Sequence, residues 1–145
     1  MKMMDDPQLD PMGSLILELR ADFDVATIVG LRVRGWKPEP GDIQDAKHYR
    51  AFIVLAALDV PPEPRAPITF ATYSATCYAA TPQAAWALWG TVVRAMHRRG
   101  PRVKTNGLGI WQTLCEGGDQ DEDPDTKQPC VRGTIFLVAT TQPVT

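Results

Sequence analysis

The chain has 145 residues, of which 44% are hydrophobic and 22% are charged, and its formal net charge is −2. This length and composition predict one globular domain over residues 1–145 and exclude a wholly disordered chain. A near-neutral chain without a basic half is a poor candidate for a dedicated nucleic-acid binder. No apolar run approaches the roughly 18 residues that span a bilayer, and residues 1–6 are too acidic for a signal peptide. We therefore expect a soluble protein without membrane association, made and used in a cytoplasm.

Residues 1–10 form an N-terminal extension, after which a helix is predicted from about residue 11 to residue 22. Asp10 is a suitable N-cap, and Pro11 has the fixed φ that suits the first helical position. Apolar residues repeat at helical spacing and predict a face that packs on a sheet: Met12, Leu15, Ile16, Leu19 and Phe23. The residues expected to point outward are Glu18, Arg20 and Asp22.

Three strands are predicted next, over about residues 27–36, 49–60 and 68–80. Apolar and polar residues alternate in the first and third of these segments. The second contains Phe52–Leu58, which is apolar on both faces and is typical of a central strand covered from two sides. Turn-forming residues 37–42 and the proline-rich segment 61–67 separate the three strands.

The second half of the chain predicts one helix and two strands. Thr81 and Pro82 open a helix over about residues 82–99, and Gly100-Pro101 ends it after basic residues that suit the helix dipole. Strands are predicted over about residues 107–116 and 131–140, with an acidic loop, 117–129, between them. The predicted fold class is therefore α+β: a largely antiparallel sheet of about five strands with two helices packed on it, in the order α-β-β-β-α-β-β.

The helix predicted over residues 82–99 carries two apolar stripes. The first is sufficient to pack the helix on a sheet: Ala85, Leu88, Trp89, Val92 and Met96. The second, formed by Trp86, Gly90 and Val93, needs a further cover, which either another subunit or the first helix of the same chain can supply. Gly90 is unfavourable inside a helix by about 1 kcal/mol, and a close approach by another backbone would explain it. Both possibilities stay open, and Trp86, Gly90 and Val93 are candidate interface residues.

Two clusters of charge are candidate contacts between subunits. The acidic loop has carboxylates at alternate positions, as in a calcium loop, but Pro124 stands where an EF-hand needs glycine and no glutamate occupies the last ligand position. We expect a solvated, extended and mobile loop, whose candidate interface residues are Asp119, Asp121 and Asp123. The basic cluster comprises Arg94, Arg98, Arg99, Arg102 and Lys104, with the first three as candidate interface residues. Because arginine forms bidentate bonds with carboxylates, we hypothesise that this cluster pairs with the acidic loop of an adjacent subunit.

The sequence predicts no catalytic residue, no cofactor and no metal site. The three cysteines, Cys77, Cys115 and Cys130, are odd in number, lack Cys-x-x-Cys spacing and fall in predicted strands or strand edges, so we expect free thiols. Two histidines are too few for a metal cluster, and no nucleophile or zinc-protease motif occurs. Gly107-Leu108-Gly109 lacks the further glycine of a dinucleotide loop. We expect a protein that is not an enzyme.

The order and spacing of several short motifs in the second half carry a family resemblance. They are Ala79-Ala80 at a strand end, Thr81-Pro82-Gln83-Ala84-Ala85 at a helix start, Gly107-Leu108-Gly109-Ile110, Glu116-Gly117-Gly118, Asp123-Pro124-Asp125 and Gln128-Pro129-Cys130-Val131-Arg132-Gly133. Over about residues 68–143, this pattern resembles the lambda-type tail terminator proteins of long-tailed (siphovirus-type) bacteriophages.

The resemblance implies a structural virion protein at the head–tail junction, assembled in the host cytoplasm as a homo-hexameric ring. Such a ring would cap the tail tube, end polymerisation of the major tail tube protein and present its other face to a head-closure or connector protein. DNA would pass through the lumen of the ring without sequence-specific binding. No cofactor is implied.

Three other interpretations stay open. A head-closure or head–tail connector protein has the same class of function with different neighbours. A small α+β enzyme or ligand-binding domain would assemble a site from residues such as Asp45, His48 and Tyr49, and would be a monomer or dimer with a deep pocket. A nucleic-acid-binding accessory protein would show salt-sensitive affinity for DNA.

Overall fold

The computed structural model of the chain describes residues 11–43, 49–59, 68–103 and 109–140. Its elements in chain order are α1 (Pro11–Ala21), α2 (Phe23–Val29), β1 (Val33–Gly35), the 3-10 helix η3 (Pro40–Asp42), β2 (Phe52–Asp59), β3 (Ile68–Tyr78), α3 (Pro82–Met96), β4 (Arg98–Val103), β5 (Gly109–Glu122) and β6 (Pro129–Thr140). The predicted α+β class is confirmed. The N-terminal extension, residues 1–10, lies outside the described residues.

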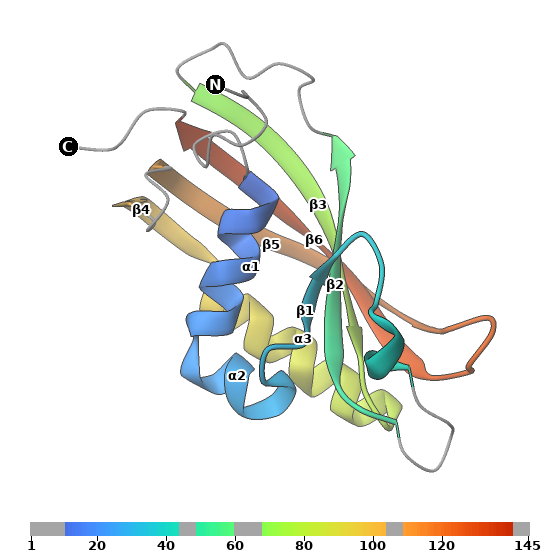
Figure 1. The fold of residues 1–145 in the computed structure, drawn as a ribbon. Helices are drawn as coiled ribbons and strands as arrows, with labels where there is room; N and C mark the ends of the chain where they lie inside the picture. Colours follow the sequence, from blue (N-terminus) through green and yellow to red (C-terminus); the bar gives the residue numbers. More distant parts are fainter. Residues whose placement is uncertain (1–10, 44–48, 60–67, 104–108, 141–145) are drawn as a thin grey trace.

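Within the described ranges, the strands form one six-stranded sheet in the order β1-β2-β3-β6-β5-β4. β1 pairs with β2 in parallel, and every other neighbouring pair is antiparallel. The helices α1, α2 and α3 lie on the same face of this sheet (Figure 1). The molecule therefore has two layers, with the main core between the helices and the sheet.

The first predicted helix is present, and most of its buried face is confirmed. Leu15 and Leu19 are fully buried in the core, with Met12 and Ile16 partly buried beside them. Phe23 was predicted on this face, but it is 82% exposed because α1 ends at Ala21 and Phe23 opens a second helix. Glu18, expected to point outward, is buried. Arg20 is half-buried, and its Nη2 donates to the carbonyl of Val33, 2.7 Å away.

The strand predicted over residues 27–36 is wrong in its first part. Asp22 is an N-cap, since its Oδ1 accepts from the backbone N–H groups of Asp24 and Val25 at 3.0 and 3.1 Å. This cap starts α2, which ends at Gly30, a C-cap residue with φ of 60°. Only the final part of the segment reaches the sheet, as the three-residue strand β1.

β2 is a central strand, as predicted, because it lies between β1 and β3. Its residues Phe52–Leu55 are all buried, although successive side chains point to opposite faces of the sheet. Ile53 and Leu55 belong to the core beneath the helices. Phe52 is on the other face, where its ring stacks on that of Tyr78 with a centroid distance of 4.4 Å. The sheet is therefore covered on both faces at this end.

Two boundaries in the second half differ from the sequence prediction. α3 ends at Met96, and Arg98–Val103 forms the edge strand β4 rather than a last helical turn. The acidic segment predicted as a loop is mostly strand, since β5 continues to Glu122 and β6 begins at Pro129. The prediction of a loop is therefore wrong for residues 117–122, which are strand, and the segment 117–129 is the end of a β-hairpin. No helix in the described part of the chain is long and apolar enough to cross a membrane.

Candidate interaction surfaces

The first apolar stripe of α3 packs on the sheet as predicted: Ala85, Leu88, Trp89, Val92 and Met96 are all buried. Of the second stripe, Trp86 is 42% exposed, and Gly90 and Val93 are half-buried. A Cβ atom added at Gly90 would meet only the side chain of Arg94, at 3.8 Å. No described backbone therefore approaches Gly90 closely, and this stripe is a partly open edge of the helix.

Two tryptophans of α3 fix the base of the β5–β6 hairpin. The indole Nε1 of Trp89 donates to the carbonyl of Gly117, and that of Trp86 donates to Oε1 of Gln120, both at 3.1 Å. A Cβ atom at Gly118 would lie 2.9 Å from the Trp86 ring, and one at Gly133 would lie 2.1 Å from the Trp89 ring. The irregularity of the ladder between Glu116 and Asp119 thus sits directly on α3. We call the contacts of Trp86 and Trp89 with the hairpin the tryptophan clamp.

The three aspartates of the hairpin have different roles. Asp123 holds the turn, because its Oδ1 accepts from the backbone N–H groups of Asp125 and Thr126 at 2.8 and 2.9 Å. These hydrogen bonds, chiefly that from Thr126, lower the pKa of Asp123 below its ordinary value. Asp119 and Asp121 are exposed on β5, at positions with side chains on the same face of the sheet. Of the three, Asp119 and Asp121 are therefore the ones exposed to a partner, although Oδ1 of Asp121 also accepts from the backbone N–H of Glu122 at 2.8 Å.

The hairpin turn is also tied to the start of β2. Gln128 is buried, and its Nε2 donates to the carbonyl of Arg50 at 2.7 Å. The hydroxyl of Tyr49 donates to the carbonyl of Thr126. Together with the tryptophan clamp, these bonds hold the acidic end of the hairpin in one orientation.

The predicted basic cluster lies at the opposite end of β5. Arg98, Arg99 and Arg102 lie on β4, in register with residues 110–113 of β5, whereas the acidic residues follow residue 115. Arg94 is exposed on α3, and its Nη2 donates to the hydroxyl of Thr91. Lys104 lies outside the described residues. Asp119 and Asp121 follow Thr113, the partner of Arg98, by six and eight residues, or roughly 20 and 26 Å of strand, so the acidic and basic ends of one chain do not meet. Figure 1 shows β4 and the β5–β6 turn on opposite sides of the molecule.

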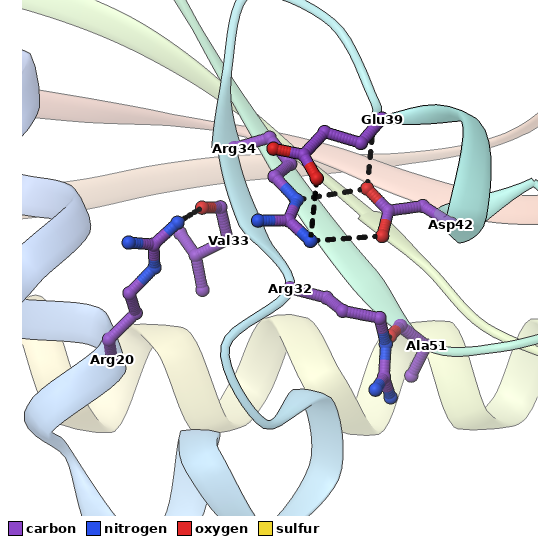
Figure 2. A network of polar contacts seen from close by, with 7 residues as sticks. All are labelled: Arg20, Arg32, Val33, Arg34, Glu39, Asp42 and Ala51. Atoms are coloured by element: carbon purple, nitrogen blue, oxygen red, sulfur yellow. Dashed lines mark hydrogen bonds and ion pairs between the residues drawn. The ribbon is translucent and has the colours of Figure 1, made fainter.

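A second group of arginines, which the sequence analysis did not select, surrounds β1 (Figure 2). Arg34 forms an ion pair with the buried carboxylate of Asp42, with Nε–Oδ2 and Nη2–Oδ1 distances of 3.0 and 3.3 Å. Its Nη2 also lies 3.4 Å from the exposed carboxylate of Glu39. Burial alone raises the pKa of Asp42, but the hydrogen bond from Arg34 and the N–H of Glu39 outweigh it and lower the pKa overall. In the sequence, this group could have been recognised from two alternating arginines, Arg32 and Arg34, that are followed by two acidic residues, Glu39 and Asp42.

The residues with reactive side chains are held in structural contacts. All three cysteines are free thiols in strands, as expected. Burial raises the pKa of Cys77 and Cys130, and it raises that of Cys115 to about 11. His97 accepts a hydrogen bond at Nδ1 from the backbone N–H of Cys115. Of the alternative enzyme site, Tyr49 contacts the hairpin turn as described above, and Asp45 and His48 lie outside the described residues. Among the residues that the structure describes, no three His, Cys, Asp or Glu side chains could hold a metal ion.

No family model matches the chain, and no curated protein matches it either. Solved structures do match. A chain from the structure of the virion of a native gene transfer agent (GTA) particle superposes with a TM-score of 0.63. The match covers 90% of this chain and 94% of that chain, at 16% sequence identity. The protein therefore shares, over nearly its whole length, the fold of a chain found in a virion.

Proposed function

We propose that this chain is a structural subunit of the virion of a long-tailed phage or phage-like particle, and that it forms the ring that ends the tail tube. The observation that carries the proposal is the fold likeness to a gene transfer agent virion chain, which covers 90% of one chain and 94% of the other. Two chains that agree in length and fold to this extent differ little in domain content. The resemblance of residues 68–143 to tail terminator proteins supports the same role independently.

The distribution of charge supports self-association in a ring. The exposed Asp119 and Asp121 lie at one end of β5, and Arg98 and Arg99 of the edge strand β4 lie at the other. Contacts between unlike surfaces of identical subunits are heterologous, and a ring results when their rotation closes. In this proposal the acidic hairpin of each subunit meets β4 of the next, with six copies in the ring. Trp86, Gly90, Val93 and Arg94 form the adjoining part of the interface on α3.

The assembled ring would contact the major tail tube protein on one side and a head-closure or connector protein on the other. DNA would pass through its lumen, and no step of this role requires catalysis or a cofactor. The site of action would be the head–tail junction of the virion. A head-closure protein is the neighbouring alternative, and tube-end binding separates the two roles.

Electron microscopy of the purified chain, alone and with purified tail tubes, tests the proposal. We expect rings in solution or on tube ends, and tubes of limited length when the chain is present during polymerisation. Reversal of charge in Arg98→Glu/Arg99→Glu should reduce ring formation measured by light scattering, and the further change Asp119→Lys/Asp121→Lys should partly restore it. Rings bound only to head connectors would assign the chain to head closure. A monomer that binds neither component would contradict the proposal.

A further inference from the structure

Three positively charged side chains line one pocket beside β1, and two of them, Arg20 and Lys37, have no carboxylate partner among the described residues. The pocket has a volume of about 320 Å³ and is lined by Arg20, Arg34 and Lys37, by Glu39 on its rim, and by an apolar wall. The wall consists of Ile16, Val33, Pro38 and Pro40. Its lining residues come from α1, β1 and the segment that follows β1, and β1 is the edge strand opposite β4 in the sheet.

The charge of this pocket is not balanced by the described residues. Arg20 donates from Nη2 to the carbonyl of Val33, its Nε is buried without an acceptor, and no described carboxylate pairs with it. The ammonium group of the exposed Lys37 likewise has no described ion-pair partner. Arg34 uses Nε and Nη2 for Asp42 and Glu39, and in Figure 2 its remaining amino group is turned to the side on which Arg20 lies. The lining therefore holds three cations and one carboxylate, that of Glu39, while the buried Asp42 pairs with Arg34 beside it.

The backbone that forms the rim of this pocket is strained. Trp36 has φ of 70°, and the N–H of Lys37 donates to the carbonyl of Gly35 at 2.8 Å, which closes a γ-turn around Trp36. This type of γ-turn is rare and unfavourable for a residue with a side chain. Such strain is more common at binding sites than elsewhere, since the surrounding structure must impose it. Here the turn joins the end of β1 at Gly35 to Lys37, and both residues line the pocket.

We propose that this pocket binds a carboxylate group presented by an acidic peptide segment of a partner protein. The excess of cations in the lining attracts a carboxylate, and its two oxygens suit the fork of a guanidinium group. The apolar wall matches the methylene groups of an acidic side chain and the backbone that carries it. This inference does not depend on the proposed ring, because the pocket is formed by α1, β1 and the segment before η3 rather than by β4 or the hairpin.

A titration monitored by NMR tests the inference on the full chain. The probe is the peptide acetyl-Asp-Glu-Asp-Glu-amide, with sodium sulfate and sodium chloride at equal ionic strength as comparisons. We expect saturable shifts of the side-chain Nε–H signals of Arg20 and Arg34 with the peptide and only weak, non-saturating drift with the two salts. Equal saturation by sulfate would overturn the assignment to a peptide carboxylate, and absence of saturation by the peptide would overturn the site.

Two matched variants show whether the pocket is responsible. Lys37→Gln removes an exposed charge at the rim, and we expect it to weaken peptide binding about 3- to 5-fold without affecting the fold. Arg32→Gln is the control, because Arg32 is not in the lining of the pocket and donates from Nε to the carbonyl of Ala51, on the side away from Arg20 (Figure 2). It should leave peptide binding unchanged. Equal weakening by both variants, or by neither, would overturn the inference.

Discussion

The contact between Gly133 and Trp89 makes Gly133→Ala the most informative single change in the core. A Cβ atom at Gly133 would lie 2.1 Å from Cζ2 and 2.3 Å from Cη2 of Trp89, a side chain that is only 4% exposed. Carbon atoms prefer a separation of about 3.5 Å, so the indole ring would have to move by roughly 1.4 Å. That movement would also disturb the 3.1 Å bond from Trp89 Nε1 to the carbonyl of Gly117.

We expect Gly133→Ala to lower the free energy of unfolding by about 3–4 kcal/mol. Overpacking in a close-packed core contributes roughly 2–3 kcal/mol of this, and the lost hydrogen bond contributes about 1 kcal/mol. With a urea m-value of about 2 kcal/mol per M, the midpoint of unfolding should fall by roughly 1.5–2 M. Circular dichroism during urea titration measures the change. Gly41→Ala is the matched control, since a Cβ there meets nothing within 4 Å, and its midpoint should stay close to that of the unchanged chain.

A double-mutant cycle then shows whether the indole ring is the cause. In a Trp89→Leu background the ring is absent, so Gly133→Ala should lower stability by less than about 1 kcal/mol, which leaves a coupling energy of at least 2 kcal/mol. A loss below about 1 kcal/mol in the unchanged chain would refute the reasoning. An equally large loss in both backgrounds would place the clash with another part of the core.

Three further predictions follow from single contacts. Asp42→Asn should lower the free energy of unfolding at pH 7 by about 2–3 kcal/mol. Since the pKa of Asp42 is lowered in the folded state, its contribution is present above the unfolded pKa and is lost as the pH falls through the folded pKa. The stabilities of the two proteins should therefore converge in acid, and a difference that persists at all acidic pH values would contradict the role of the ionised carboxylate. Burial raises the pKa of the Cys115 thiol from 9.0 to about 11. Because the thiolate is the reactive form, Cys115 should react with iodoacetamide at pH 8 about 100-fold more slowly than a free thiol. Labelling at the ordinary rate would contradict its burial. Trp36→Gly should give a free energy of unfolding about 1 kcal/mol above that of Trp36→Ala, because glycine adopts the positive φ of this position without strain. Equal free energies of unfolding in thermal denaturation would show that the γ-turn stores no strain.

The limits of the sequence prediction are clearest where a local pattern fits two structures. Val29, Leu31 and Val33 alternate with polar or small residues, which favours a strand, yet Val29 ends a helix that Asp22 caps. The signals for the helix were present, with a capping aspartate before it and Gly30 after it. They were outweighed by the alternation because a helix of seven residues shows little periodicity of its own.

The end of α3 could not be derived from local sequence because contacts with β5 determine it. The carbonyl of Met96 accepts from the hydroxyl of Thr113, and His97 accepts from the backbone N–H of Cys115. Residues 97–99 suit a helical C-terminus by charge, so helix propensity alone extends α3 too far. Gly100-Pro101, interpreted as a helix stop, lies instead at an irregularity of the β4–β5 ladder. A proline there leaves an edge strand unsuited to pairing with a further strand.

Candidate interface residues were identifiable by type from the sequence, but their placement required the fold. The sequence located the acidic segment and the basic cluster without showing that one rigid sheet separates them. It also gave equal status to Asp119, Asp121 and Asp123, whereas the structure assigns Asp123 to the turn. The arginines around β1 were overlooked because their partners, Glu39 and Asp42, follow in a segment that appeared to be an ordinary turn.

The separation of acidic and basic ends has a direct consequence for assembly. Charges that could meet within one chain would pair there, since an intramolecular contact does not depend on concentration. β5 prevents this by holding Asp119 and Asp121 roughly 20–26 Å along the strand from Thr113, the partner of Arg98. This separation is at least about two Debye lengths at 0.1 M salt, so that pairing of these ends requires a second copy. The tryptophan clamp and the contact of Gln128 with Arg50 fix the direction in which the acidic end projects. In the proposed assembly this fixed direction sets the angle between successive subunits, and a heterologous interface gives a closed ring where that rotation closes and an open filament where it does not.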